Sequence, residues 1–308
     1  VFNYVKLVRL VRVGKRIEHL VVRHMHTQEE RVVTAKYVVN TTGPWTDEVL
    51  SNWDSTRKSL LRLSKGIHVV VRFPWQKRAM LALARDDKRV FFVLPWYGNT
   101  LIGTTDTEYS GTMDTLKPTE ADIDYLLQNA QPYFKDHQLS RKDVLTTFIG
   151  CRPLVRKSKR SLGGLSRKHR VIKPYANVLV VVGGKYTTYR SLSEGVARRV
   201  MSFFGRGWFF RSLTRHLPLY GGEIKDLDPY VTKKYPVESN IYPIDKVLYR
   251  HVVFQYGSVY ADALSVMCEN EVYRDRLKGT DYYRGDVIYA IRQECAVTIV
   301  DFMRRRTR

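Results

Sequence analysis

Cysteine is scarce in this sequence, and long apolar runs are absent. The three cysteines, Cys151, Cys268 and Cys295, stand far apart and form no CxxC pair. A disulfide framework and a metal centre are therefore not expected, and a reducing compartment is the default. No apolar stretch approaches the roughly 20 residues of a membrane-spanning helix. A secretory signal is not expected either, because the first thirteen residues alternate in polarity and carry three basic side chains.

Acidic residues are outnumbered: 30 Asp and Glu stand against 52 Lys and Arg, which leaves a formal net charge of +22. Such a charge predicts contact with an anionic partner, whether nucleic acid, a membrane surface or a charged metabolite. Residues 152–173 hold nine of the basic residues and no acidic one. Most of these side chains are interpreted as a solvated loop, and one or two of them as functional.

Two phosphate-binding signatures are missing. Neither GxGxxG nor GxxxxGK[ST] occurs, so these residues contain no pyrophosphate-binding loop of either kind. The sequence starts without Met and inside a strand-like pattern, which favours a piece of a longer protein. Its 308 residues, 44% of them hydrophobic, are nevertheless enough for two domains with sizeable cores.

The hydrophobic pattern predicts a mixed α/β chain. Short alternating stretches over residues 5–39 are typical of an antiparallel meander, and residues 65–110 return to strands. Within KGIHVVVRF, alternation places His68 on the strand face opposite Ile67. The run VLVVV (178–182) is typical of a strand that is buried on both faces.

Helices are predicted at several places. A short one follows Gly43-Pro44, and a longer one begins after Thr119, whose side chain suits an N-cap. Another follows the strand at 178–182. Residues 244–308 are predicted to be helical, with arginines at a helix C-terminus. One apolar stripe is expected there from Ile288, Ile291, Cys295, Ile299 and Phe302.

The stretch VVVGGKYTTYR (180–190) has the features of a ligand site. Gly183 and Gly184 lack a Cβ, so a ligand can approach their backbone closely. The helix that follows offers free N–H groups and the positive end of its dipole, and Lys185 adds a full charge. The alternative is a strand-to-helix turn that simply needs glycine.

Three further residues are candidates for binding or catalysis. Arg152 lies between Gly150 and Pro153, where its guanidinium could form a bidentate contact with a carboxylate or phosphate; a buried ion pair is the alternative. His68 could serve as a general base or be a structural residue. Arg167 could bind an anion or simply be solvated in its loop.

Seven motifs in one order carry a family resemblance: VVNTTGPWTDEVL, SKGIHVVV, VFFVLPWYGNTLIGTTDTEY, LSRKDVLTTFIGCRPLV, LSRKHRVI, VVVGGKYTTYRSLSE and ECAVTIVDFMRRRTR. Together they closely resemble FAD-dependent glycerol-3-phosphate dehydrogenase, in the superfamily of D-amino-acid-oxidase-like flavoproteins. The resemblance runs nearly from end to end. GGKxTTYR, together with GTTD and RRTR, is typical of this family rather than of its amine-oxidising relatives.

The resemblance implies a partial FAD-binding domain, an antiparallel-sheet substrate domain over the flavin, and a helical C-terminal cap domain. The FAD domain is expected at 1–50 and 175–205, the substrate domain at 51–174, a linker at 206–235 and the cap at 236–308. The implied reaction is oxidation of sn-glycerol 3-phosphate to dihydroxyacetone phosphate. The electrons are expected to pass through FAD to quinone or, in an oxidase branch, to oxygen.

Carried over residue by residue, the resemblance assigns roles to the candidates. His68 matches a histidine beside the substrate hydroxyl, and Arg152 and Lys185 complete the implied catalytic group. Arg152, Arg167 and Lys185 are the implied ligands of the substrate phosphate. The implied FAD contacts are Gly43, Gly183, Gly184, Lys185, Thr187 and Thr188.

The sequence also departs from the family. The Gly-rich FAD loop of family members is absent, so these 308 residues alone are expected to be colourless or poor in flavin. Ile67 stands where many members have Ser or Val, and residues 156–160 are unusually basic. One alternative is a superfamily member that oxidises an amino acid through a carboxylate clamp. The other, a nucleic-acid-binding protein, is less favoured because the aromatics lie mainly in strand-like runs typical of a core.

Residues 198–216 combine arginines with aromatic side chains, which suits an anionic membrane surface. The alternative is a helix end that packs into a linker. We expect a peripheral protein on the cytoplasmic face of a bacterial cell membrane, or on the mitochondrial inner membrane in a eukaryote.

Overall fold

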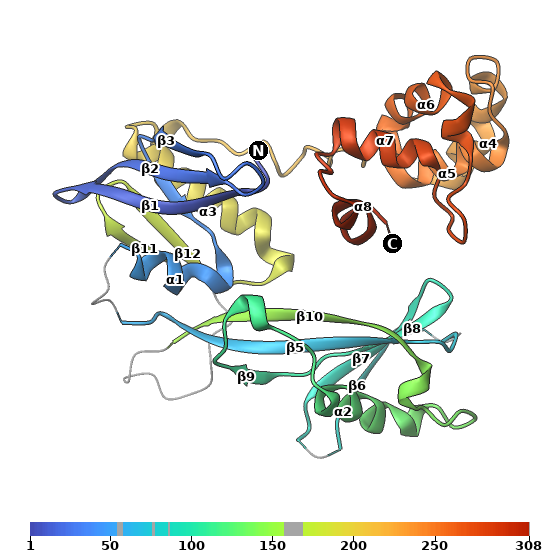
Figure 1. The fold of residues 1–308 in the computed structure, drawn as a ribbon, viewed down its shortest axis with the longest axis horizontal. Helices are drawn as coiled ribbons and strands as arrows, with labels where there is room; N and C mark the ends of the chain where they lie inside the picture. Colours follow the sequence, from blue (N-terminus) through green and yellow to red (C-terminus); the bar gives the residue numbers. More distant parts are fainter. Residues whose placement is uncertain (54–57, 76–77, 86, 157–168, 308) are drawn as a thin grey trace. The chain divides into compact units, whose positions relative to one another are not determined.

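The computed structural model describes residues 1–53, 58–75, 78–85, 87–156 and 169–307. It divides the chain into a larger unit, Tyr4–Phe210, and a smaller unit formed by Val1–Asn3 with Arg211–Arg308. Figure 1 colours both units along the sequence. Apart from Val1–Asn3, the ranges expected for the FAD and substrate domains lie in the larger unit, and the finer division of that unit stays a prediction.

The larger unit contains two small sheets of three strands each. The first is antiparallel, in the order β1 (Val5–Val13), β2 (Arg16–His24) and β3 (Glu30–Thr34), which confirms that part of the predicted meander. The last stretch of the meander was predicted wrongly, because β4 (Val38–Asn40) pairs in parallel with β12 (Val178–Val182). Alternation reveals a strand but not its partner. β11 (Arg170–Tyr175) completes the second sheet, and β12 is buried throughout, as expected.

A longer antiparallel sheet forms the middle of the larger unit. Its order is β10 (Val144–Val155), β5 (Leu61–Val71), β8 (Asn99–Gly103), β7 (Val90–Trp96) and β6 (Met80–Leu83), with β9 (Thr107–Tyr109) also paired to β5. A two-residue turn at Tyr97 and Gly98, both with positive φ, joins β7 to β8. Because β10 is an edge strand, it tolerates Pro153, which has no N–H to donate.

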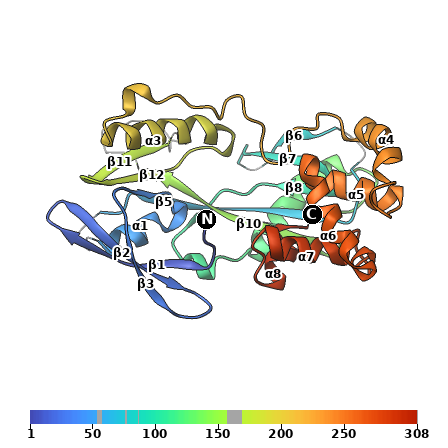
Figure 2. The same cartoon turned by 90° about the horizontal axis from the view of Figure 1, so that it is seen from above.

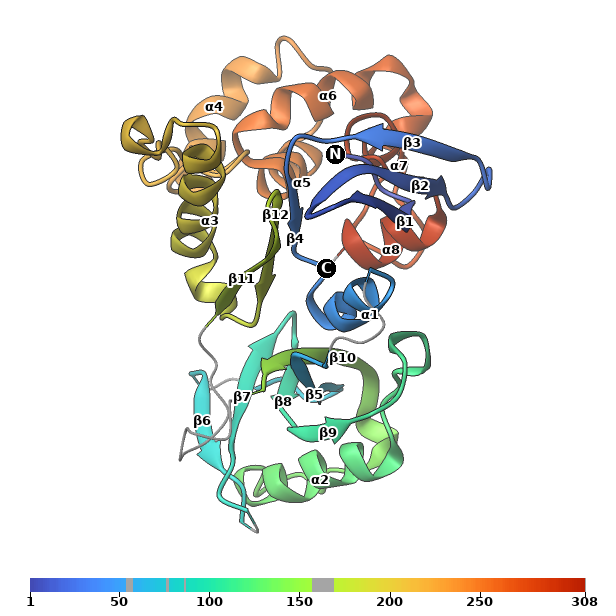
Figure 3. The same cartoon turned by 90° about the vertical axis from the view of Figure 1, so that its left-hand side faces the viewer.

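Helix α2 (Glu120–Ala130) covers one face of this sheet (Figures 1 and 3). A capping box between Thr119 and Asp122 begins the helix, as the sequence predicted. Asp122 also forms a buried ion pair with Lys65 of β5, at 2.5 Å, which joins the helix to the sheet. Ile67 is fully buried on this face, whereas His68 is only half-buried on the other. The face without α2 is therefore the one available for a site.

Two further α-helices of the larger unit follow the ends of β4 and β12. The turn η1 (Gly43–Trp45) leads into α1 (Thr46–Ser51), and η5 (Tyr186–Thr188) leads into α3 (Tyr189–Phe203). Val196 of α3 packs against Leu179 and Val181 of β12, and α3 runs alongside β11 and β12 in Figure 2. Both predicted strand-to-helix units are therefore present.

The smaller unit is helical, as predicted. Its helices are α4 (Leu227–Glu238), α5 (Lys246–Tyr256), α6 (Tyr260–Glu269), α7 (Arg284–Gln293) and α8 (Ile299–Arg305). Tyr249, Leu264 and Met267 lie at the centre of its core. The interval 206–235, expected to be a linker, already contains the first part of α4.

The apolar stripe expected across the last two helices was wrong. The chain leaves α7 after Gln293, and Cys295 takes a positive φ of 53°. Thr298 then caps a separate helix, α8, through a capping box with Asp301. Phe302 is buried, but Ile299 is 78% exposed, so the two do not share a stripe. The T-x-x-D signal that starts α8 overrides the apolar spacing.

Two aromatic side chains near the C-terminal end of the larger unit are exposed. Trp208 and Phe209 are 99% and 86% exposed, whereas Phe203 packs edge-on against Tyr37. Of the aromatics in the strand-like run of β7, Phe91 is buried and Phe92 is 39% exposed, so only part of that run is core. Across the described residues, no helix combines the length and the apolar character needed to cross a bilayer.

Candidate functional site

His68 and Arg152 lie on the same face of the long sheet. In the antiparallel pairing of β5 with β10, His68 stands opposite Phe148, and Arg152 stands opposite Ser64. Directly opposed residues share a face, and so do residues two apart on one strand. Positions 64, 66 and 68 of β5 therefore lie on the same face as Arg152. This is the face that α2 does not cover.

Two glycines let these side chains lie against the sheet. A Cβ added to Gly66 would come within 2.3 Å of Arg152 Nη2, so the guanidinium lies where that methyl group would be. A Cβ added to Gly103 would come within 2.1 Å of His68 Cδ2. Glycine inside a strand is typical of such close approaches. Gly66 and Gly103, which have no side chain, thus allow the guanidinium and the imidazole to lie close to the sheet.

Three contacts hold the guanidinium of Arg152. It lies over Gly66, its Nη2 donates a hydrogen bond to Thr104 Oγ1 at 2.9 Å, and its Nη1 is 3.6 Å from Asp106 Oδ1. Nη1 is buried and has no hydrogen-bond partner among the described residues. Nη1 can therefore donate a charge-assisted hydrogen bond to an anion that binds here.

The environment of His68 favours the neutral imidazole. Burial lowers the pKa of His68 below its ordinary value of 6.5, and the positive charge of Arg152 lowers it further. Among the described residues, none forms a hydrogen bond with the ring. A neutral imidazole with a free nitrogen can accept a proton near pH 7.

The predicted cofactor glycines meet at one edge of the second small sheet. β4 and β12 run parallel, so their carboxyl ends point the same way, with Gly43 after one and Gly183-Gly184 after the other. All three glycines have positive φ, of 56°, 71° and 108°. An added Cβ on Gly43 would meet nothing within 4 Å, so its surroundings are open. The turn that contains Gly43 lies beside β10, the strand of Arg152.

The remaining predicted site residues are exposed or lie outside the described residues. Lys185, Thr187 and Thr188 are exposed in and before the turn η5. No contact among the described residues joins Lys185 to His68 or Arg152. The helix itself begins one 3-10 turn later than Lys185. Arg167 lies outside the described residues.

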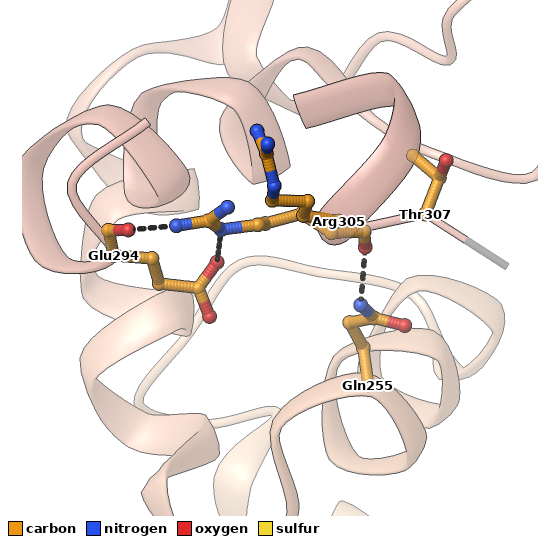
Figure 4. A pocket seen from close by; sticks show the side chains of 5 residues that line it. Gln255, Glu294, Arg305 and Thr307 are labelled. Carbon is orange, nitrogen blue, oxygen red and sulfur yellow. Dashed lines mark hydrogen bonds and ion pairs between the residues drawn. The ribbon is translucent and has the colours of Figure 1, made fainter. Parts of the chain in front are cut away.

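Three open pockets lie away from His68 and Arg152. Two belong to the larger unit: one of about 320 Å³ beside α1, and one of about 450 Å³ lined by Tyr37, Lys173 and Arg199 among others. The third, of about 420 Å³, lies in the smaller unit (Figure 4). Its lining residues are Gln255, Glu294, Arg305, Arg306 and Thr307.

In the pocket of Figure 4, the polar groups largely satisfy one another. Burial raises the pKa of Glu294 above its ordinary value, although the charge of Arg306 opposes the rise. Gln255 donates a hydrogen bond to the Arg306 carbonyl at 3.0 Å. The pocket holds none of the residues predicted to be functional.

Comparison with known protein families shows which family the chain belongs to. The family model described as "FAD dependent oxidoreductase" matches residues 1–189. The chain belongs to the family of FAD-dependent oxidoreductases. The model "C-terminal domain of alpha-glycerophosphate oxidase" matches residues 212–308, which corresponds to the smaller unit. The family predicted from the seven motifs is confirmed, and FAD is the cofactor of that family.

The names of two relatives refer to dehydrogenation of phosphorylated polyols. The chain is 29% identical to an aerobic glycerol-3-phosphate dehydrogenase of Staphylococcus saprophyticus, over 96% of this chain and 54% of the relative. It is 34% identical to D-erythritol 1-phosphate dehydrogenase of Brucella abortus, over 93% of this chain and 57% of the relative. The chain thus spans about half the length of the curated relatives that it matches.

A solved structure supports the fold. The glycerol-3-phosphate dehydrogenase of Bacillus halodurans, complexed with FAD, matches with a TM-score of 0.85 and 27% identity. The match covers 99% of this chain and 60% of the solved one. The mixed α/β architecture with its helical C-terminal part is therefore that of this family.

The edge formed by β4 and β12 fits a bound cofactor. Its glycines expose backbone, and the space over Gly43 is open. Asn40, at the end of β4, is 5% exposed; its Oδ1 accepts two hydrogen bonds from Thr42, but its buried Nδ2 has no partner among the described residues. An open backbone beside an unsatisfied donor is the setting that a polar group of a cofactor would complete.

Thr104 and Asp106 were missed as site residues, although the motif GTTD contributed to the family resemblance. Both contact Arg152, yet they come almost fifty residues before it. A signal was present: the glycine of GTTD ends a strand and is followed by three polar side chains, a pattern typical of a turn that presents functional groups.

Proposed function

We propose that the protein containing this chain oxidises sn-glycerol 3-phosphate to dihydroxyacetone phosphate. Bound FAD would supply the hydride acceptor. The observation that carries the proposal is the pairing of a neutral imidazole, His68, with a guanidinium, Arg152, whose buried Nη1 is unused. A secondary alcohol that loses a hydride must also lose a proton, and its phosphate needs a cation. The two groups meet these two needs.

Each residue has a proposed task. His68 accepts the hydroxyl proton. Arg152 binds the substrate phosphate through charge-assisted hydrogen bonds and so orients the substrate carbon. Lys185 and Arg167 are proposed to add charge to the same phosphate. Gly43, Gly183, Gly184, Lys185, Thr187 and Thr188 are proposed to line FAD, with the positive charge of Lys185 favouring its reduced, anionic form.

The electron acceptor and the location are further parts of the proposal. Quinone or oxygen would take the electrons. Trp208 and Phe209, which are nearly fully exposed and adjoin Arg206 and Arg211, are proposed to rest on an anionic membrane surface. The proposed setting is the cytoplasmic face of a bacterial cell membrane, or the mitochondrial inner membrane.

A longer phosphorylated polyol is a second candidate substrate. The relative named D-erythritol 1-phosphate dehydrogenase is 34% identical to this chain. It calls for the same two tasks, a base at an alcohol and a cation at a phosphate. Arg152 and His68 do not distinguish the two substrates, because both groups act on the part that the substrates share.

The experiment mixes the FAD-loaded protein that contains this chain with each substrate under anaerobic conditions and follows the flavin absorbance. We expect rapid bleaching with sn-glycerol 3-phosphate and little with glycerol. Faster bleaching with D-erythritol 1-phosphate would replace the first substrate by the second. Bleaching by an amino acid alone would contradict the proposal.

Gly66→Ala is expected to displace the Arg152 guanidinium, because the new Cβ would lie 2.3 Å from Nη2. We expect KM for sn-glycerol 3-phosphate to rise about tenfold, the equivalent of ~1.4 kcal/mol of binding. The control is Gly150→Ala, directly opposite on β10, where an added Cβ meets nothing within 4 Å. Steady-state kinetics of both variants measure this. An equal rise in both would show that any methyl group on this face blocks the site.

The pH dependence should follow the lowered pKa of His68. The base must be neutral, and burial together with Arg152 lowers its pKa below 6.5. Activity should therefore persist as pH falls through 6.5, where an ordinary histidine is half protonated, and decline only below it. The measurement is kcat/KM between about pH 5 and 8. Since the substrate phosphate titrates at about pH 6, His68→Gln serves as control, and an identical profile in that variant would exclude His68.

A further inference from the structure

The loop between β8 and β9 places a carboxylate beside the Arg152 guanidinium. Asp106 Oδ1 lies 3.6 Å from Arg152 Nη1, beyond hydrogen-bond range but close enough for an ion pair. The two side chains are 41% and 32% exposed, so solvent screens the attraction only in part. We propose that Asp106 is a positioning residue that holds Arg152 for the substrate phosphate. This inference rests on the function proposed above.

Asp106 is itself held from two sides. Ser64 Oγ donates a hydrogen bond to Asp106 Oδ1, and Arg89 Nη1 donates one to the Asp106 backbone carbonyl. Ser64 is buried on β5 and stands directly opposite Arg152 on β10. The carboxylate is thus anchored to the strand next to the arginine that it attracts. A group anchored in this way can orient a flexible partner.

Arg152 is oriented so that one donor is left over. Gly66 leaves room for the guanidinium against the sheet, and Thr104 Oγ1 accepts a hydrogen bond from Nη2. Asp106 attracts Nη1 without accepting a hydrogen bond from it. Nη1 remains buried and unused. An arginine held in its binding geometry loses less conformational entropy when the anion arrives. Asp106 therefore lowers the concentration of phosphorylated substrate needed for binding.

The opposite role would be competition, in which Asp106 occupies Arg152 until the phosphate displaces it. That role requires a carboxylate that can move away. The bonds from Ser64 and Arg89 restrain such movement, and the 3.6 Å separation leaves Nη1 without a hydrogen bond to give up. The contacts favour positioning. The two roles predict changes of KM in opposite directions when the carboxylate is removed.

The test compares Asp106→Ala with Glu108→Ala in the FAD-loaded protein. Glu108 is the matched control, because it lies two residues further along and pairs with another arginine, Arg62, at 2.8 Å. Asp106→Ala should raise KM for sn-glycerol 3-phosphate about tenfold and change kcat less than about threefold. Glu108→Ala should leave KM within about twofold. Asp106→Asn retains the acceptor for Ser64 and should give an intermediate KM.

A readout independent of turnover separates this inference from the proposed function. Calorimetric titration with inorganic phosphate should show about tenfold weaker binding to Asp106→Ala than to the wild type or Glu108→Ala. Ser64→Ala, which leaves the charge in place, should weaken binding in the same direction. Tighter phosphate binding, a lower KM, or equal values in all variants would overturn the positioning role. Failure of the wild type to oxidise any phosphorylated polyol would overturn the proposed function alone.

Discussion

Replacing His68 with glutamine is expected to lower the rate of flavin reduction by about a hundredfold to ten-thousandfold, the range typical of a lost general base. Glutamine retains a polar side chain of similar reach, but its amide cannot accept the substrate proton. KM should change little, because Arg152 still binds the phosphate. The measurement is anaerobic stopped-flow reduction of the FAD-loaded variant at saturating sn-glycerol 3-phosphate.

The chain offers a matched control for this substitution. His137 stacks on Phe73, and its Nε2 lies 3.3 Å from Asp143 Oδ1. It has no role in the proposed site. His137→Gln should leave the rate of flavin reduction within about threefold. A fall of less than about threefold in His68→Gln would remove His68 from the mechanism, and an equal fall in both variants would point to folding instead.

Replacing Arg152 with methionine is expected to lower kcat/KM for sn-glycerol 3-phosphate about a hundredfold to a thousandfold. The substitution keeps the aliphatic stem over Gly66 and removes the charge and the unused donor. Glycerol, which has no phosphate, should lose little. The preference for the phosphorylated substrate over glycerol should therefore collapse, and the ratio of the two kcat/KM values measures this.

Arg141→Met is the control for Arg152→Met. Arg141 forms exposed ion pairs with Glu120 and Asp124 of α2, on the other face of the sheet. Its loss removes the same net charge without touching the site, so the substrate preference should stay. If Arg152→Met keeps its preference for the phosphorylated substrate, Arg152 does not bind the phosphate.

Local rules predicted a large part of the fold. Alternation in β5 placed His68 and Ile67 on opposite faces, and burial bears this out. Thr119 caps α2 as its chemistry suggests. These features depend on neighbours within a few residues, which is why sequence periodicity and capping preferences reveal them.

Features that depend on distant partners were harder to predict. β4 joins β12 rather than the adjacent meander, and a periodic pattern carries no information about such pairing. The contact of Arg152 with Thr104 and Asp106 arises because β10 pairs with β5, as do β8 and β9, the strands on either side of these two residues. The break before α8 was a different failure: the capping signal at Thr298 stands in the sequence, but the prediction relied on apolar spacing alone.

The candidate site was predicted in part. His68 and Arg152 were identified as functional candidates, and the structure brings them to one face, where the Arg152 charge lowers the His68 pKa. The roles of Gly66 and Gly103 became visible only with coordinates, because what matters is the side chain that occupies the space of the missing Cβ. The convergence of Lys185 with this pair stays a prediction.

The most direct test is a crystal structure of the FAD-loaded protein with dihydroxyacetone phosphate. We expect a phosphate oxygen within hydrogen-bond distance of Arg152 Nη1, Lys185 on the same phosphate, and the carbonyl of dihydroxyacetone phosphate facing His68. A phosphate bound elsewhere, with Arg152 Nη1 still unpartnered and His68 remote from the ligand, would contradict the account.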